Sequence, residues 1–313
     1  MKKPLIVIAG PTACGKTDIS IDLAEKIGGE IISGDSMQVY KYMDIGTAKA
    51  TKEEMRGIPH YLVDELYPDE EYNVMLFQQK AKQYMEGIYS RGHIPIIVGG
   101  TGFYINALVY DNDFSEEEES EIRKELYAVA ENEGAEKLHA MLAEVDPEYA
   151  ANIHHNNVKR VARALEYYRL TGEKMSEHNK NAKKKETPYN LAFFVLNMDR
   201  EKLYERINLR VDIMMNNGLE QEVRKLIEMR YSPELVSMQG LGYKEFIPYF
   251  NGEISLEQVV VDIKKYTRRF AKRQLTWFRG QTNGTWLDMG TLSKDKALEI
   301  MLDELKTKKI IEG

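Results

Sequence analysis

The chain has 313 residues, of which 43% are hydrophobic and 30% charged, with a formal net charge of −7 at pH 7. This composition is typical of a globular protein of roughly two domains, and it excludes a global positive field that would attract nucleic acid. The single cysteine excludes an internal disulfide, and no apolar run is long enough to span a bilayer, so we expect a cytoplasmic protein without a membrane partner.

The N-terminal part alternates predicted strands and helices. Short apolar runs at Pro4–Ala9, Glu30–Ser33 and Ile94–Gly100 predict buried strands, and the apolar spacing in 17–27 and 77–90 predicts helices. This alternation indicates a parallel sheet with right-handed crossovers. Ligands of such sheets bind at the carboxyl ends of the strands, where all three predicted strands run into polar or glycine-rich sequence.

A helical insertion is predicted over residues 113–189. It begins with an acidic segment that Ser115 or Ser120 would cap, and a lysine-rich stretch, 173–190, is expected to be a loop or linker. Strand character returns at Leu191–Asp199, and the chain is then mostly helical to about Trp277. Residues 1–112 and 190–313 would therefore form one α/β core around an all-helical insertion.

The segment "GPTACGKT", Gly10–Thr17, fits the pattern G-x-x-x-x-G-K-[ST]. Gly10 and Gly15 allow backbone N–H groups to converge on anionic oxygens, and the following helix adds its positive end. Lys16 adds a charge, and the Thr17 hydroxyl suits Mg²⁺. We therefore predict a P-loop NTPase-like core whose phosphate loop consists of Gly10, Pro11, Thr12, Ala13, Cys14, Gly15, Lys16 and Thr17. A hydrolysed nucleotide, a transferred phosphoryl group and a diphosphate leaving group all suit such a loop.

The acid that usually holds Mg²⁺ in switch NTPases is absent after the strand 94–98, which runs into "GGTGFY". Asp199 follows a later strand, but it precedes a helical pattern, so we favour a helix N-cap over a metal ligand. Asp35 directly follows the second predicted strand and is the acid best placed near the phosphate. It suits a general base acting on an acceptor, and the alternative is a salt-bridged structural aspartate.

Two basic stretches oppose the negative net charge. The first contains Lys159, Arg160 and Arg163, and the second, 264–280, has seven basic residues and no acid. As a helix, the second would place aromatic residues on a core face and cations on another: Tyr266, Phe270 and Trp277 against Lys265, Arg268, Lys272 and Arg279. Each stretch alone fits a solvated cationic helix, whereas the two together favour an RNA or DNA partner. No histidine has metal-ligand spacing with a cysteine or another histidine, so no metal beyond Mg²⁺ is expected.

The motifs also occur in one order: "GPTACGKT", "GDSMQVYKYMDIGTAK", "IPHYLVD", "PIIVGGTGFYI", "KRVARALE", "GLGYKEF" and "TRRFAKRQLTWFR". From about residue 4 to 280 the chain resembles the tRNA dimethylallyltransferase (tRNA isopentenyltransferase) family in its bacterial form. The resemblance implies transfer of a dimethylallyl group from dimethylallyl diphosphate to the N6 amine of the adenosine 3′ of the anticodon, with release of diphosphate. A monomer is expected.

The resemblance also implies roles for individual residues. The phosphate loop would hold the diphosphate with Mg²⁺ at Thr17, and Arg210 would be a further diphosphate ligand. Asp35 corresponds to the general base and Thr101 to a residue near the reacting centre. Contacts to tRNA are implied for Asp35, Ser36, Met37, Gln38, Thr101, Arg123, Lys159, Arg160, Val161, Ala162 and Arg163.

The chain departs from the family where many members have Gln-Arg instead of Lys159-Arg160 and His-His instead of His60-Tyr61. The C-terminal region lacks cysteines, so the zinc finger of some relatives is not expected. Two alternatives stay open. One is a P-loop kinase that uses ATP, with Asp35 as base for a small-molecule hydroxyl, and the other is a nucleotide-gated RNA-binding module without chemistry.

Overall fold

The computed structural model describes residues 2–111, 120–182 and 186–312. The chain divides into two compact units: Met1–Asn112 together with Thr187–Gly313, and Asp113–Glu186. The second unit begins where the predicted insertion begins, and it ends at residue 186 rather than 189. Each unit has a hydrophobic core of its own, so the two are described separately.

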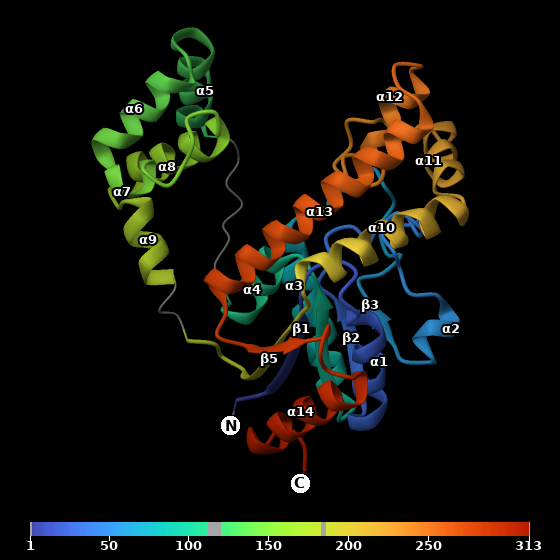
Figure 1. The fold of residues 1–313 in the computed structure, drawn as a ribbon. Helices are drawn as coiled ribbons and strands as arrows, with labels where there is room; N and C mark the ends of the chain where they lie inside the picture. The colour runs from blue at the N-terminus through green and yellow to red at the C-terminus, as the bar shows by residue number, and fades with distance from the viewer. Residues whose placement is uncertain (1, 112–119, 183–185, 313) are drawn as a thin grey trace. The chain divides into compact units, whose positions relative to one another are not determined.

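The strands of the first unit form a six-stranded sheet in the order β3-β2-β4-β1-β5-β6 (Figure 1). Every neighbouring pair is parallel, which confirms the predicted α/β class and parallel sheet. The predicted strands are present, whereas the two edge strands β3 and β6 were not predicted. The bounds are β1 Pro4–Ala9, β2 Gly29–Ser33, β3 His60–Tyr61, β4 Ile94–Gly99, β5 Asn190–Asn197 and β6 Thr285–Asp288.

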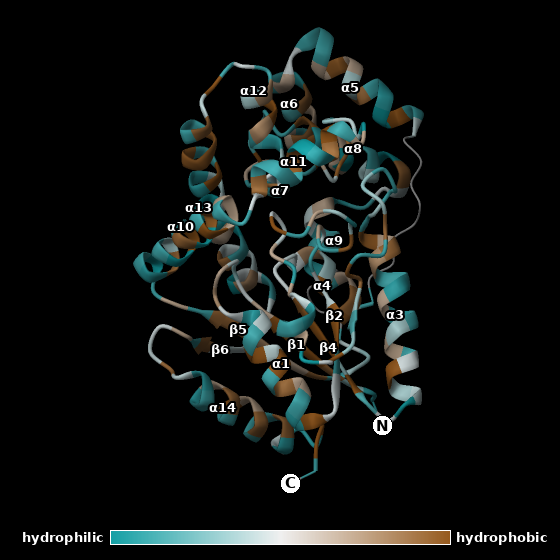
Figure 2. Cartoon of the chain, turned by 90° about the vertical axis from the view of Figure 1, so that its right-hand side faces the viewer, coloured by the Kyte–Doolittle hydropathy of each residue, from teal (hydrophilic) through white to brown (hydrophobic). Residues whose placement is uncertain are grey.

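Helices cover both faces of this sheet. Leu5 and Val7 of β1 belong to the core on one face, which includes residues of α3 (Val74–Ser90) and α4 (Gly102–Val109). Ile6 and Ile8 belong to the core on the other face, with residues of α1 (Lys16–Ile27) and α14 (Lys294–Thr307). Burial on both faces explains why β1 is a continuous apolar run, and the central strands are hydrophobic in Figure 2.

The remaining helices of this unit follow β2 or β5. Asp199 accepts hydrogen bonds from the backbone N–H groups of Glu201 and Lys202, so the favoured interpretation as a helix N-cap is confirmed. This capped helix, α10, packs against a later helix of the same unit, α13 (Leu256–Gln281). The bounds are α2 Lys52–Met55, α10 Arg200–Asn216, α11 Leu219–Glu228, η1 Lys244–Phe246, α12 Ile247–Phe250 and α13 Leu256–Gln281.

The predicted core face of α13 is wrong. Its buried positions include Ile263, Thr267, Ala271, Gln274 and Phe278, a stripe rotated from the predicted aromatic face. The predicted aromatic residues are only partly buried, and cations lie over two of them: Lys265 and Arg269 over Tyr266, and Arg273 over Phe270. Gln274 lies on this stripe where α13 approaches the backbone of residues 12 and 100, as described below.

The second unit is helical, as predicted. Its core includes Leu126, Leu138, Leu142, Val161 and Leu165. Ser120 caps the first helix, whereas Ser115 lies outside the described residues. Part of the expected 173–190 loop is instead a helix, α9, because the N–H of Ser176 donates to buried Asp146 and fixes the chain there. The bounds are α5 Glu121–Glu133, α6 Ala135–Val145, α7 Pro147–Ala150, α8 Val158–Thr171 and α9 Met175–Ala182.

Candidate functional site

The phosphate loop, Gly10–Thr17, connects β1 to α1 at the carboxyl edge of the sheet. Gly10 has a φ of 148°, and a Cβ there would lie 2.5 Å from the carbonyl oxygen of Leu196 in β5. Gly15 has a φ of 93° immediately before α1, a conformation that favours glycine. The two glycines are therefore required by close approach and by backbone conformation, respectively. Cys14 is buried in the hydrophobic core, where its small side chain fills space.

Side chains from distant helices brace this loop. Gln274 of α13 accepts a hydrogen bond from the N–H of Thr12 at 3.0 Å and donates to the carbonyl of Gly100 at 2.9 Å. Arg206 of α10 donates to the carbonyl of Ala13 at 2.9 Å, and Ala13 has a left-handed φ of 65°. The neighbours therefore hold a backbone conformation that a non-glycine residue rarely adopts.

Positive groups converge on the loop. The ammonium of Lys16 donates to the carbonyls of Gly10 and Pro11, at 3.1 and 2.7 Å. The guanidinium of Arg210 donates to the Thr12 hydroxyl at 3.4 Å, so the structure brings Arg210 to the phosphate loop. Burial lowers the pKa of Arg210, although an arginine in a protein keeps its charge. Two cations and the N-terminus of α1 give this edge the positive charge that an anion would require.

Asp35 lies two residues beyond β2 at the same edge of the sheet, and its Oδ1 accepts the N–H of Met37 at 2.8 Å. Burial raises the pKa of Asp35, while that hydrogen bond and the charges of Lys16 and Arg210 oppose the rise. The charges of Lys16 and Arg210 therefore act on this carboxylate, which lies at the same edge of the sheet as the phosphate loop. A carboxylate with a raised pKa accepts a proton more readily, which suits a general base.

The ends of β2 and β4 meet beside Asp35. A Cβ on Gly99 would lie 2.3 Å from the backbone of Gly34, which shows how closely the two strands approach. The Thr101 hydroxyl accepts the N–H of Ser36 at 3.1 Å and donates to its hydroxyl at 3.4 Å. The structure therefore brings Thr101 against the segment that contains Asp35.

The side chain of Gln38 makes contacts within the protein. Its amide oxygen accepts the hydroxyl of Ser33 at 2.9 Å, and its amide nitrogen donates to the carbonyls of Thr47 and Ala48 at 3.2 and 3.4 Å. Gln38 therefore fixes the path of the chain after Asp35.

Thr17 was expected to bind Mg²⁺, and its surroundings fit that ion. It lines a cavity of about 30 Å³ together with Ser20, Ser33 and Gln38, which has room for water. Mg²⁺ usually keeps several waters and takes one or two protein ligands plus phosphate oxygens. Within residues 2–111, 120–182 and 186–312, no three His, Cys, Asp or Glu side chains gather as a metal site. Bound magnesium would therefore rely on Thr17, phosphate oxygens and water.

The expected tRNA contacts of the second unit differ in exposure. Lys159, Arg160 and Arg163 are exposed on α8, whereas Val161 and Ala162 are fully buried in the helical core. The side chains of these two residues can therefore only position their neighbours. Arg123 makes an ion pair with Glu166, which is 2% exposed, and the side chain of Arg123 is 18% exposed.

Sequence reasoning missed Gln274 and Arg206 as parts of the site. Gln274 lies within "TRRFAKRQLTWFR", a segment interpreted through its charges, its aromatic residues and its place among the family motifs. The spacing of Gln274 from Ala271 and Phe278 puts the three on one helical face, but the sequence did not show that this face is buried. Across the described part of the chain, no helix has the length and apolar character needed to cross a membrane.

Comparisons with known proteins agree with this geometry. The chain is 54% identical to a tRNA dimethylallyltransferase of Lachnoclostridium phytofermentans, covering 99% of each, and 50% identical to one of Acetivibrio thermocellus, covering 94% of each. It matches a crystal structure of a tRNA delta(2)-isopentenylpyrophosphate transferase from Staphylococcus epidermidis at 46% identity and a TM-score of 0.74, covering 98% of this chain and 100% of that one.

A crystal structure of a eukaryotic dimethylallyltransferase acting on tRNA matches at 33% identity and a TM-score of 0.82, covering 97% of this chain and 80% of that one. A family model described as IPP transferase matches residues 38–281. These findings confirm the resemblance stated from the sequence motifs. The chain belongs to the IPP transferase family of prenyl-transferring enzymes.

Proposed function

We propose that this enzyme transfers a dimethylallyl group from dimethylallyl diphosphate to the N6 amine of the adenosine 3′ of the anticodon in tRNA. The observation that carries the proposal is the placement of Asp35, a carboxylate with a raised pKa, beside the cations of an anion-binding loop. A proton acceptor and a diphosphate site at one edge of the sheet are what this transfer requires. The relatives named for this activity cover nearly the full chain.

The transfer forms one bond and breaks another. The N6 nitrogen attacks C1 of the dimethylallyl group, and the bond from C1 to the diphosphate oxygen breaks, with its electron pair leaving on the diphosphate. The N6 proton passes to the carboxylate of Asp35. Positioned base catalysis of this kind is worth about 10²–10⁴-fold in rate.

The leaving group develops negative charge where the loop concentrates positive charge. Lys16, Arg210 and the backbone N–H groups before α1 stabilise the departing diphosphate more than the bound donor, which lowers the barrier. Mg²⁺ held at Thr17 would neutralise further charge on the phosphate oxygens. Bracing by Gln274 and Arg206 fixes the loop before the donor binds.

The acceptor is a base in an RNA loop. Such a base must leave its stack, which costs a few kcal/mol. We propose that the exposed Lys159, Arg160 and Arg163 contact tRNA phosphates, and that this binding energy offsets the cost of unstacking the base. Ser36, Met37 and Thr101 would line the position of the adenine. The expected monomer stays a prediction, which light scattering would test.

The test is prenyl transfer to unmodified tRNA. Purified enzyme, Mg²⁺ and dimethylallyl diphosphate should give a prenylated adenosine, detected by mass spectrometry of the digested nucleosides. A matched tRNA with guanosine 3′ of the anticodon should give no product, and Asp35→Asn should bind tRNA but lose turnover. Transfer of phosphate from ATP to a metabolite hydroxyl, without prenylated product, would support a P-loop kinase and overturn the proposal.

A further inference from the structure

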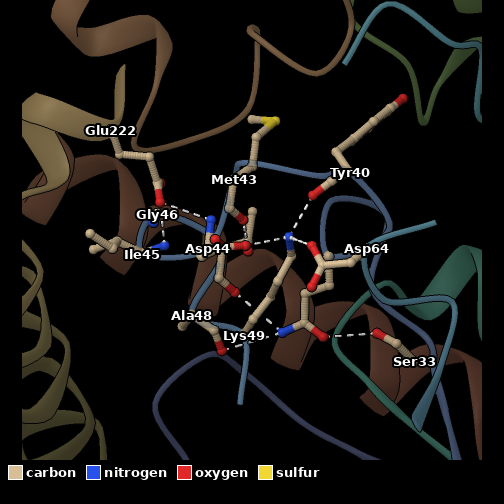
Figure 3. Close-up of polar contacts among 12 residues, drawn as sticks. Ser33, Tyr40, Met43, Asp44, Ile45, Gly46, Ala48, Lys49, Asp64 and Glu222 are labelled. Carbon is tan, nitrogen blue, oxygen red and sulfur yellow. Dashed lines mark hydrogen bonds and ion pairs between the residues drawn. The ribbon is translucent and has the colours of Figure 1, made fainter. Parts of the chain in front are cut away.

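Glu222 of α11 binds a backbone turn more than 170 residues earlier in the chain. Its Oε2 accepts the N–H groups of Asp44 and Ile45 at 2.9 and 2.8 Å, and its Oε1 accepts the N–H of Gly46 at 3.0 Å. Figure 3 shows the carboxylate of Glu222 directed at this turn. Three successive backbone N–H groups on one carboxylate form a strong and directional attachment, because hydrogen bonds to a charged acceptor are the stronger kind.

The carboxylate of Glu222 accepts a fourth hydrogen bond, this one from a side chain. The hydroxyl of Tyr243 donates to Oε1 of Glu222 at 2.7 Å, and Tyr243 is fully buried. A Cβ on Gly46 would lie 2.5 Å from the ring of Tyr243, so the turn and the ring are in close contact. We call this group, residues 44–46 with Glu222 and Tyr243, the turn anchor.

The turn anchor continues into the segment that contains Asp35. The Lys49 side chain is 4% exposed and binds the carboxylates of Asp44 and Asp64 and the carbonyl of Tyr40 (Figure 3). The carbonyls of residues 47 and 48 accept the amide of Gln38. The amide oxygen of Gln38 accepts the hydroxyl of Ser33, and this hydroxyl in turn accepts the N–H of Asp35 at 3.4 Å. Hydrogen bonds, together with the backbone that links residues 44–46 to 47 and 48, therefore join Glu222 to the backbone of Asp35.

A second path reaches the same segment. A Cβ on Gly240 would lie 2.4 Å from the side chain of Met37, so the loop before Tyr243 packs directly on the residue that donates to Asp35. The turn anchor and this packing contact fix the segment 35–38 from both sides. Neither path passes through the phosphate loop.

We propose that Glu222 is a positioning residue for the transfer reaction, one that acts by fixing the place of Asp35 and Gln38 through the turn at 44–46. This role rests on the proposed function, in which Asp35 is the base. The carboxylate of Glu222 is engaged by the turn and by Tyr243, so its loss should act on the alignment of the base with the N6 amine. A misplacement of about 1 Å costs on the order of 10²-fold in rate.

Glu222→Gln is the sharpest test, because all four partners of the carboxylate are donors. The substituted amide keeps the shape but must direct its own N–H₂ at two of them. We expect the single-turnover rate to fall about 10–100-fold while the affinities for tRNA and for dimethylallyl diphosphate stay unchanged. Tyr243→Phe removes one donor and leaves the turn bound, so a smaller fall in the same direction is expected.

The matched control is Glu30→Gln. Glu30 is a buried carboxylate that, like Glu222, has several partners, here Tyr61, Arg91 and His93, and it lies at the opposite end of β2 from Asp35. The substitution Glu30→Gln should destabilise the fold without changing the single-turnover rate of the folded enzyme. Equal rate losses in the two variants at matched stability would reduce Glu222 to a structural residue and overturn the proposal.

Hydrogen exchange supplies a readout that does not depend on transfer. Amide exchange over residues 36–50 should accelerate about tenfold or more in Glu222→Gln and stay unchanged in Glu30→Gln. Unchanged exchange in Glu222→Gln would overturn the turn anchor even if activity fell. If the wild-type enzyme transferred no prenyl group, the proposed function would fail, whereas accelerated exchange would still support the anchor.

Discussion

Gln274→Leu removes the side chain that joins α13 to two parts of the site. The N–H of Thr12 loses its acceptor, and the carbonyl of Gly100 loses a donor. The N–H of Thr12 is only partly buried, so the loss there is that of an ordinary hydrogen bond, about 0.5–1.5 kcal/mol. Gly100 keeps the N–H of Gly102 at 3.1 Å, so the loss there is also about 0.5–1.5 kcal/mol. We therefore predict that the free energy of unfolding falls by about 1–3 kcal/mol.

Binding should weaken as well, because Gln274 holds the phosphate loop in place. One hydrogen bond to an anion is worth about 1.5–3 kcal/mol, so a single misdirected N–H group should raise the Kd for inorganic diphosphate roughly 10–100-fold. Titration calorimetry with diphosphate and Mg²⁺ measures this change. Urea denaturation followed by tryptophan fluorescence measures stability, and Trp277 reports on the site because it packs on Gly102.

Gln258→Leu is the matched control for this substitution. Gln258 lies on the exposed first turn of the same helix, and its amide contacts only Asp262 among the described residues. Its replacement should change the free energy of unfolding by no more than about 0.5 kcal/mol. If Gln274→Leu matched this control in both stability and diphosphate affinity, the assignment of Gln274 as a brace would be refuted.

Three further predictions concern charge. Burial raises the pKa of Asp35, so the contribution of Asp35 to stability is present at acidic pH and is lost as the pH rises through the pKa of the folded state. Asp35→Asn should therefore be more stable than wild type at pH 7. Urea denaturation at a series of decreasing pH values should show that this gain disappears in acid. The pKa of Glu30 is lowered from 4.5 to about 2, mainly by the hydrogen bond from Arg91, and this shift contributes about 3 kcal/mol to the free energy of unfolding at neutral pH. Glu30→Gln should lose this stability at neutral pH. The difference from wild type should vanish as the pH falls through about 2. Changing Lys159, Arg160 and Arg163 together to Ala should make the salt dependence of tRNA binding shallower by a slope of about 2–3 in filter-binding titrations, and an unchanged slope would show that the patch is only solvated.

The first unit was largely predictable around the phosphate loop because local signals are dense there. An apolar strand, two glycines and a helix that begins at Lys16 follow one another within 24 residues, Pro4 to Ile27. Asp35 could be placed for a related reason, since the carboxyl ends of parallel strands share one edge. Edge strands β3 and β6, with two and four residues, are too short to show a period.

The face of α13 could not be predicted from helical spacing alone. Aromatic residues at the right spacing favoured a core face, but the buried stripe of α13 instead combines Phe278 with the smaller Ala271 and with Gln274, whose amide binds backbone groups of residues 12 and 100. Gly102 illustrates the same limit, because the ring of Trp277 occupies the place where its Cβ would be. Such complementarity depends on two segments far apart in sequence.

The turn anchor could not be predicted from the sequence either. Glu222 lies on an amphipathic helix where an acidic residue is expected to face water, and nothing in its neighbourhood marks it as a ligand of residues 44–46. The segment around those residues was noted only as part of a family motif. Its conformation is set by a carboxylate supplied from elsewhere in the chain.

The brace between Thr12 and Gln274 also has a consequence for synthesis on the ribosome. The two residues are 262 positions apart, so at about 5–20 residues per second roughly 13–50 s separate their emergence. β5 and α10 are synthesised within that interval, but the N–H of Thr12 lacks its acceptor until Gln274 of α13 follows. A nascent chain therefore reaches its full diphosphate affinity only near the end of translation, and a product truncated before residue 274 should bind diphosphate about 10–100-fold more weakly.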